Sequence, residues 1–339
     1  MHKWVKRGKD IGKNDTPASM IVRACDAYAN RPVFGTPTEQ LVPAAHMPRT
    51  SSRYALVEAA QMKLEEKDDF RWLTYDQLGW LVQRVAKGLV SMGLPENAKI
   101  AIAGYNDIEW MVTDFAIAVA GFVSVGIHTT YSAANAEAVI NKVECDALCT
   151  MRNLIETRDA DQLWSLRSLH CPSLKVVAVM DGFASGSNET ETFARDFSNY
   201  SMASYLDWVS PSNITLDSIE LKDPFDARGA VYPMLDQDVD APPAHLMTLL
   251  FTSGSSGTPK AVAVGTDAFV NDISGDFSSG EAISKSLTVS YIPLSHSSDR
   301  YKVWEHVVWG GRVVFCFFSS HHWEAHEKDK KGKIDGCYD

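Results

Sequence analysis

The sequence predicts an α/β fold in which parallel sheets are flanked by helices. Helix-like and strand-like segments alternate from about residue 74 onward, and the strand-like segments are apolar at nearly every position. Such continuous apolar runs are typical of parallel strands, which are buried on both faces, whereas half-exposed strands alternate apolar and polar residues. The expected strands are 99–104 (K-I-A-I-A-G), 122–127 (F-V-S-V-G-I), 146–150 (D-A-L-C-T) and 174–180 (L-K-V-V-A-V-M).

Helices are expected between these strands. Thr74 can cap a helix at 75–94, in which apolar residues recur with helical spacing and Gly93 marks the end. A second helix is expected over residues 107–120 and a third over residues 133–143. The apolar stripe of the first of these helices consists of Leu78, Leu81, Val82, Val85, Leu89 and Val90.

The other segments are less regular. Residues 20–30 are expected to form a helix near the N-terminus. Residues 182–240 are rich in Ser, Asn, Asp and Pro, and we expect a long insertion or surface excursion that carries a helix-like Y-L-D-W-V at 205–209. The apolar run at 245–251 predicts a strand that leads directly into a Gly/Ser-rich loop, and 313–318 predicts a last strand.

Composition excludes several classes of protein. The chain has 339 residues, 45% of them hydrophobic, and a net charge of −11, which argues against a nucleic-acid-binding surface. Its six cysteines contain no C-x-x-C pair, so we expect neither a disulfide framework nor a zinc site. The N-terminus lacks the apolar region of a signal peptide, and the longest apolar stretch, 115–127, is too short to span a bilayer. We expect a cytoplasmic protein that is not secreted. Peripheral association with the endoplasmic reticulum or another membrane is left open, as is the oligomeric state.

The segment 252–260, T-S-G-S-S-G-T-P-K, has the residues that a phosphate-binding loop requires. Such a loop needs backbone N–H groups that point inward, glycines that permit this approach, hydroxyl donors and a cation. The segment 252–260 supplies all four of these features and directly follows an expected strand. The candidate phosphate-binding residues are Thr252, Ser253, Gly254, Ser255, Ser256, Gly257, Thr258 and Lys260.

Two other kinds of loop share some of these features. A Walker A loop does not fit, because Lys260 follows a proline and Ala261 replaces the Ser or Thr that would hold magnesium. A Gly/Ser turn without a ligand is the other alternative. The order of hydroxyl residues and glycines, together with the preceding apolar strand, favours the phosphate-binding loop.

The segment resembles the phosphate-binding signature of the adenylate-forming superfamily of AMP-dependent synthetases and ligases. That superfamily includes acyl-CoA synthetases, luciferases and nonribosomal-peptide adenylation domains. Two further stretches are similar to its N-terminal region and occur in the same order: one from F-R-W-L-T-Y-D-Q-L at 70–78 through N-D-I-E-W-M-V-T-D-F at 106–115, and G-F-V-S-V-G-I-H-T-T-Y-S at 121–132. The resemblance covers about residues 18–317 and is weakest at about 182–240.

The resemblance implies an enzyme that joins a carboxylate to the α-phosphate of ATP and then transfers the acyl group from the adenylate to coenzyme A. Because two anions must approach each other, such a site needs charge neutralisation more than a base. The implied ligands are ATP, Mg²⁺, coenzyme A and a carboxylic acid, most simply a fatty acid. The β- and γ-phosphates of ATP are expected on 252–258 with Lys260 nearby, and Thr252 is an implied Mg²⁺ ligand.

His296 is the expected substrate-binding residue. It lies in Y-I-P-L-S-H-S-S-D-R at 291–300, which is similar to a segment of long-chain fatty acyl-CoA synthetases and, less closely, of carboxylic acid reductases. In those enzymes the corresponding histidine lies beside the acyl pocket. A histidine that only caps a helix is an open alternative. A hydrolase built from Ser295, His296 and Asp299 is disfavoured, since adjacent Ser and His rarely reach nucleophile–base geometry and no G-x-S-x-G is present.

The chain departs from the family pattern at its C-terminal end. Ala261 stands where the family usually has Gly, and the later family motifs are absent: Y-G-x-T-E, T-G-D, the hinge and the lid domain with its catalytic lysine. We therefore expect an N-terminal extension at 1–17, a partial synthetase domain at 18–318 and a polar, disordered non-family tail at 319–339. A truncated gene product or an erroneous gene model would explain this.

The sequence is therefore compatible with three functions. The first is that of a fatty acyl-CoA synthetase, although this chain has no complete catalytic set and is expected to lack full activity. The alternatives are the adenylation module of a carboxylic acid reductase and a non-catalytic fragment that binds a nucleotide or a partner.

Overall fold

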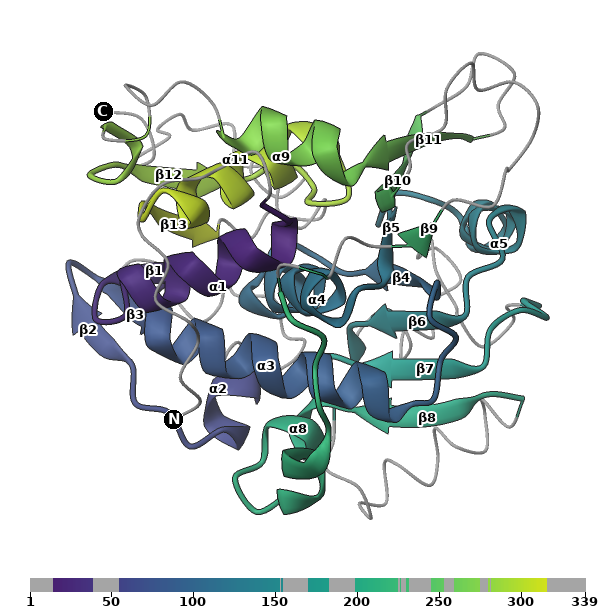
Figure 1. Cartoon of the computed structure of the whole chain (residues 1–339), viewed down its shortest axis with the longest axis horizontal. Coiled ribbons are helices and arrows are strands. Elements are labelled where there is room, and N and C mark those ends of the chain that lie inside the picture. The colour runs from purple at the N-terminus through teal and green to yellow at the C-terminus, as the bar shows by residue number, and fades with distance from the viewer. Residues whose placement is uncertain are drawn as a thin grey trace, which may run out of the picture.

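The computed structural model describes residues 15–38, 55–152, 154, 170–182, 199–224, 226, 230–231, 245–252, 259–274, 280 and 282–315. In these ranges two sheets are joined by helices that pack between them (Figure 1). The prediction of an α/β fold with parallel strands flanked by helices is confirmed. The helices are α1 (Pro17–Ala27), α2 (Ala55–Ala59), α3 (Tyr75–Ser91), α4 (Ile108–Ala120), α5 (Ala133–Lys142), α8 (Tyr205–Val209), the 3₁₀ helix η3 (Ile214–Ser218), α9 (Thr266–Ser274) and α11 (Ser297–Val308).

The larger sheet, eight-stranded over the described residues, contains the four strands that the apolar runs predict. Its order is β11-β10-β5-β4-β6-β7-β8, with β9 paired to β10. All pairings from β10 to β8 are parallel, whereas β11 and β9 run antiparallel to β10. The strands are β4 (Lys99–Ala103), β5 (Val123–Ile127), β6 (Ala147–Thr150), β7 (Val176–Val179), β8 (Ser201–Ser204), β9 (Ala230–Val231), β10 (His245–Thr252) and β11 (Lys260–Gly265).

The smaller sheet joins the two ends of the described chain. Its order is β12-β13-β1-β3-β2, and β13, the last described strand, pairs in parallel with both β12 and β1. The β1–β3 and β3–β2 pairs are antiparallel, so this sheet is mixed. The strands are β1 (Pro32–Pro37), β2 (Glu65–Lys67), β3 (Phe70–Thr74), β12 (Leu287–Ser290) and β13 (Arg312–Phe315).

The strand β4 shows why continuous apolar strands predicted this architecture. Successive side chains of a strand point to opposite faces of its sheet. Ile100 and Ile102 therefore belong to the core between the two sheets, whereas Ala101 and Ala103 belong to a second core under α5. Both faces are buried, so no polar alternation is possible along this strand.

Local signals in the sequence set the ends of α3 and α4. Thr74 caps α3 through the backbone N–H of Gln77, and the Gln77 side chain accepts a hydrogen bond from the Thr74 N–H in return. Gly93, just beyond the helix, has a positive φ of 66°. Asp107 caps α4, whose residues are all buried because it packs against α3 and between the sheets (Figure 1).

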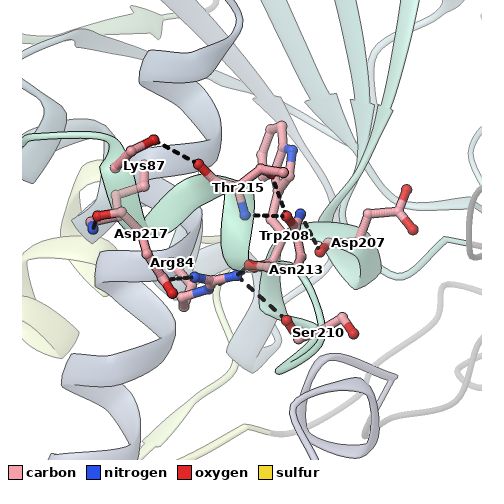
Figure 2. Close-up of polar contacts among 9 residues, drawn as sticks. Arg84, Lys87, Asp207, Trp208, Ser210, Asn213, Thr215 and Asp217 are labelled. Carbon is pink, nitrogen blue, oxygen red and sulfur yellow. Dashed lines mark hydrogen bonds and ion pairs between the residues drawn. The ribbon is translucent and has the colours of Figure 1, made fainter.

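Residues 199–218 of the excursion expected at 182–240 contain regular elements, and the helix-like Y-L-D-W-V expected at 205–209 is confirmed as α8. These residues form β8, which extends the larger sheet in parallel beside β7, then α8 and η3, which pack on α3. The Arg84 guanidinium of α3 holds this segment, since it donates to the backbone carbonyls of Trp208 and Asn213 and pairs with Asp217 (Figure 2). The strand β8 was not predicted, because the segment is mostly polar. Only a few apolar side chains, among them Trp208, anchor it to the rest of the fold.

Several predictions fall partly or wholly outside the described residues. They concern residues 1–14 of the expected N-terminal extension, loop residues 253–258 and the tail at 319–339. Within the described part of the chain, no helix has the length and apolar character that a membrane span requires. The apolar stretch at 115–127 is divided between α4 and β5.

Candidate functional site

The expected phosphate-binding loop begins and ends in a β-hairpin. Thr252, the last residue of β10, lies directly opposite Lys260, the first residue of β11, and both are exposed. Lys142 on α5 donates to the Pro259 carbonyl at 3.3 Å and so fixes the end of the loop from the side of α5. The two described candidates for phosphate binding, a hydroxyl and an amine, are thus neighbours. The others, Ser253, Gly254, Ser255, Ser256, Gly257 and Thr258, lie outside the described residues.

His128, which the sequence analysis did not single out, lies next to this hairpin. Because β5 and β10 are parallel neighbours, their carboxyl ends meet at one edge of the sheet, and His128 directly follows β5. Its Nε2 lies 3.4 Å from the Phe251 carbonyl oxygen, and its Nδ1 lies 2.8 Å from the Ser295 hydroxyl. A carbonyl only accepts, so Nε2 carries the proton and Nδ1 accepts from Ser295. The sequence signals were the position of a polar residue at the carboxyl end of a parallel strand and its place in the family-like stretch 121–132.

His296 caps α11. Its Nδ1 accepts a hydrogen bond from the Ser298 backbone N–H at 3.3 Å, and its ring is exposed. The structure therefore shows a helix cap at this histidine. The His296 ring also lies 6.4 Å from the ring of His128, centroid to centroid, so it borders the same sheet edge as the hairpin. Its contact with a carboxylate substrate stays a prediction.

The hydrolase alternative is not formed. Ser295 is 3% exposed and is bound to His128 and not to His296. Asp299 faces elsewhere, since it accepts from the Ser290 hydroxyl and pairs with Lys302. A buried serine without a carboxylate behind its histidine does not match the arrangement of a nucleophilic triad.

Asn106 physically connects two of the sequence motifs. Its side-chain N–H₂ donates to the Ser290 hydroxyl at 2.9 Å and to the Ile292 carbonyl at 2.6 Å, while its side-chain oxygen accepts from the Leu294 N–H at 3.0 Å. The N-D-I-E-W turn thus holds the backbone of the segment that leads to His296.

Asp114 and Arg300 form a second connection between the same motifs. The Arg300 Nε donates to Asp114 at 2.8 Å, and both side chains are fully buried. Arg300 also donates to the hydroxyls of Thr248 on β10 and Ser124 on β5. The start of α11, β5 and β10 are therefore held together beneath the site by one guanidinium group.

Glu109 is a buried carboxyl with no such partner. It is 2% exposed, and neither of its carboxyl oxygens has a hydrogen-bond partner among the described residues. Burial raises its pKa well above the usual 4.5, and the neighbouring Asp107 raises the pKa further. Burial therefore favours the neutral, protonated form of this carboxyl.

Comparison with protein-family models gives a match to the AMP-binding enzyme family over residues 44–329. The chain belongs to this family. The matched range includes the described strands from β2 to β13, together with the hairpin and the His296 segment. It also extends into the 319–339 segment, which the sequence analysis places outside the family.

Curated relatives include fatty acyl-CoA synthetase A of Dictyostelium discoideum, which is 27% identical over 251 residues. That alignment covers 74% of this chain and 33% of the relative. The human long-chain-fatty-acid–CoA ligase ACSBG1 is 26% identical over 263 residues, covering 74% of this chain and 31% of its own length. The chain thus spans about a third of the length of these relatives.

Solved structures support the fold. The adenylation domain of a carboxylate reductase from Mycobacterium chelonae matches with a TM-score of 0.59 and 19% identity, covering 89% of this chain and 42% of that domain. A long-chain-fatty-acid CoA ligase from Rhodopseudomonas palustris, whose assignment is putative, matches with a TM-score of 0.56 and 15% identity, covering 92% and 61%. At these identities the likeness concerns the fold alone.

Proposed function

We propose that this chain forms the ATP- and carboxylate-binding part of an enzyme that activates a fatty acid as its acyl-adenylate and then transfers it to coenzyme A. The observation that carries the proposal is the position of Thr252 and Lys260, which lie opposite each other at the sheet edge that His296 also borders. The kinship with fatty acyl-CoA synthetases supports the same substrates.

The residues have separate roles in this proposal. Lys260 supplies a positive charge for the phosphates of ATP, and the Thr252 hydroxyl supplies a hydrogen-bonding group beside it. His296 borders the approach of the carboxylate. No base is required, because the carboxylate is already the nucleophile when ionised.

Thr252 also fits a role toward Mg²⁺, which would neutralise phosphate charge at this site. Mg²⁺ is commonly held by substrate phosphates and water together with one or two protein oxygens. Within the described ranges no group of three His, Cys, Asp or Glu residues could hold a metal by itself. An exposed hydroxyl beside the phosphate position is consistent with binding of the ion together with ATP.

The proposal is tested by measuring ATP binding to the purified chain by calorimetry, with Lys260→Ala as the variant and Lys285→Ala, another exposed lysine, as the control. We expect Lys260→Ala to weaken ATP binding about tenfold, as the loss of one charge-assisted contact implies, with an unchanged melting temperature. Equal affinities of the wild type and Lys260→Ala would refute the role of the hairpin. Carboxylate-dependent ATP–pyrophosphate exchange then measures whether this chain itself catalyses activation.

The adenylation module of a carboxylic acid reductase is the second candidate, favoured by the fold likeness to such domains. It shares the adenylation step and differs in the acyl acceptor. Transfer to free coenzyme A and not to a carrier protein, measured with the longest available form of this protein, would support the synthetase.

A further inference from the structure

One histidine to which the sequence motifs gave no role connects three separate parts of the candidate site. His128 follows β5, and its two ring nitrogens contact Phe251, 123 residues away at the end of β10, and Ser295, 167 residues away beside His296. A single imidazole ring thus bridges the base of the hairpin and the segment that carries the expected substrate-binding residue.

The same two segments are already close at this point. A Cβ atom added at Gly126 would lie 3.1 Å from the Cα and from the carbonyl oxygen of Ser295. His128 follows Gly126 by two positions in extended chain, so the side-chain positions of both residues face the same side of the sheet. Both meet Ser295, which places the turn before α11 directly against the end of β5.

The ring of His128 is also held from its other side. The Tyr131 ring packs edge-on against it at 4.9 Å between centroids, and the Tyr131 N–H donates to the His128 carbonyl. Burial and the neighbouring His296 lower the pKa of His128, while the bond to Phe251 raises it. The net effect favours the neutral ring, in which Nδ1 accepts from Ser295.

We propose that His128 is a positioning residue that fixes the distance between the Thr252–Lys260 hairpin and the His296 segment. The significance of that distance rests on the proposed function: ATP phosphates on one side and a carboxylate on the other must meet at a defined separation. The link itself can be tested without reference to catalysis.

Two conservative variants separate the two contacts. His128→Asn retains an amide oxygen near the position of Nδ1 and so retains the bond to Ser295, but it does not reach Phe251. His128→Gln retains an amide N–H₂ near the position of Nε2 and so retains the bond to Phe251, but it loses Ser295. His128→Phe keeps the packing on Tyr131 and loses both bonds.

Hydrogen–deuterium exchange of the chain, read on peptides 246–252 and 291–298, tests the link. We expect His128→Phe to increase exchange about fivefold in both peptides, the factor that corresponds to the loss of one net hydrogen bond in each. His128→Asn should affect only 246–252, and His128→Gln only 291–298. His306→Phe is the control, because His306 is half-buried and its ring Nδ1 contacts the Lys302 carbonyl within α11, away from the hairpin. Unchanged exchange in His128→Phe, or loss of this selectivity between Asn and Gln, would overturn the link.

A second measurement separates positioning from stability. In carboxylate-dependent ATP–pyrophosphate exchange, His128→Phe should be slower by about tenfold or more, while its affinity for ATP alone stays within about twofold of the wild type. Undiminished exchange activity in this variant would overturn the positioning role. If the wild-type chain has no exchange activity, this chain does not catalyse activation by itself, and the peptide experiment decides whether His128 links the two segments.

Discussion

Arg300 and Arg84 each connect a helix to a distant part of the chain, but they do so in opposite surroundings. Arg300 and its partner Asp114 are both fully buried, and the other groups that hydrogen-bond with them are side chains of β5, β10 and α11. The Arg84 side chain is 10% exposed, its partner Asp217 is 67% exposed, and its other acceptors are backbone carbonyls of the α8–η3 segment (Figure 2).

The difference determines what each pair contributes. A buried charge that loses its partner stays in the core uncompensated, so the fold depends on both members. A guanidinium that binds several carbonyls near the surface loses little when one exposed carboxylate is removed, because water and the other acceptors compensate. Arg300 therefore supports the candidate site from beneath, and Arg84 attaches a peripheral segment to α3.

The largest expected effect is that of Asp114→Ala. It leaves Arg300 charged and buried, and we expect a loss of about 3–5 kcal/mol in the free energy of unfolding. Chemical denaturation followed by circular dichroism measures this loss. The double variant Asp114→Leu/Arg300→Met, which removes both charges, should recover part of it. A double variant no more stable than Asp114→Ala would mean that the hydrogen bonds, and not the unpaired charge, dominate.

Arg84→Met should have a smaller effect. It keeps much of the apolar stem and removes the donors to Trp208 and Asn213, for an expected loss of about 1–3 kcal/mol. Because these bonds hold α8 and η3, exchange of amide hydrogens in residues 205–218 should increase more than in β4. Arg71→Met, at an exposed pair with Glu66, is the control and should stay close to wild type.

Glu109 lies on the same helix as Asp114, but among the described residues it has no basic partner comparable to Arg300. Its pKa in the folded state is raised above 4.5, so its contribution to stability is complete below that pH and is lost as the pH rises through the folded pKa. Glu109→Gln, which does not ionise, should therefore be more stable than the wild type at pH 8. Denaturation curves at several pH values should show this difference vanish toward pH 4.5; a difference independent of pH would contradict the buried-carboxyl explanation.

Asp217→Asn should have the smallest effect. The Asp217 side chain is mostly exposed, and Arg84 keeps its carbonyl acceptors, so we expect a change of about 0–1 kcal/mol. Thermal melting of Asp217→Asn and of Arg84→Met, compared with the wild type, measures the contribution of each member of the pair. A loss as large as that of Arg84→Met would show that the ion pair, and not the carbonyls, holds the segment.

Local elements were largely predictable from the sequence. Thr74, Asp107 and Gly93 mark helix ends through short-range hydrogen bonds or a positive φ, and these signals depend on few neighbours. The segment at 199–218 was harder to predict, because β8 exists only through its pairing with β7. Of the candidate site, the sequence predicted Thr252, Lys260 and His296 as candidate residues and left a helix cap at His296 as an alternative, but it did not predict the hairpin that places Thr252 opposite Lys260.

The alternation of helices and strands, the buried parallel sheet and the motifs of the AMP-binding enzyme family are predictable from the sequence alone. Periodicity, capping residues and loop composition depend on residues that are close together in the chain. The tertiary structure decided that Asn106 holds the His296 segment, that Asp114 pairs with Arg300 and that Ser295 binds His128 and not its neighbour His296. Each of these contacts joins residues more than a hundred positions apart. Their geometry follows from how β5, β10 and α11 pack, which no local pattern encodes.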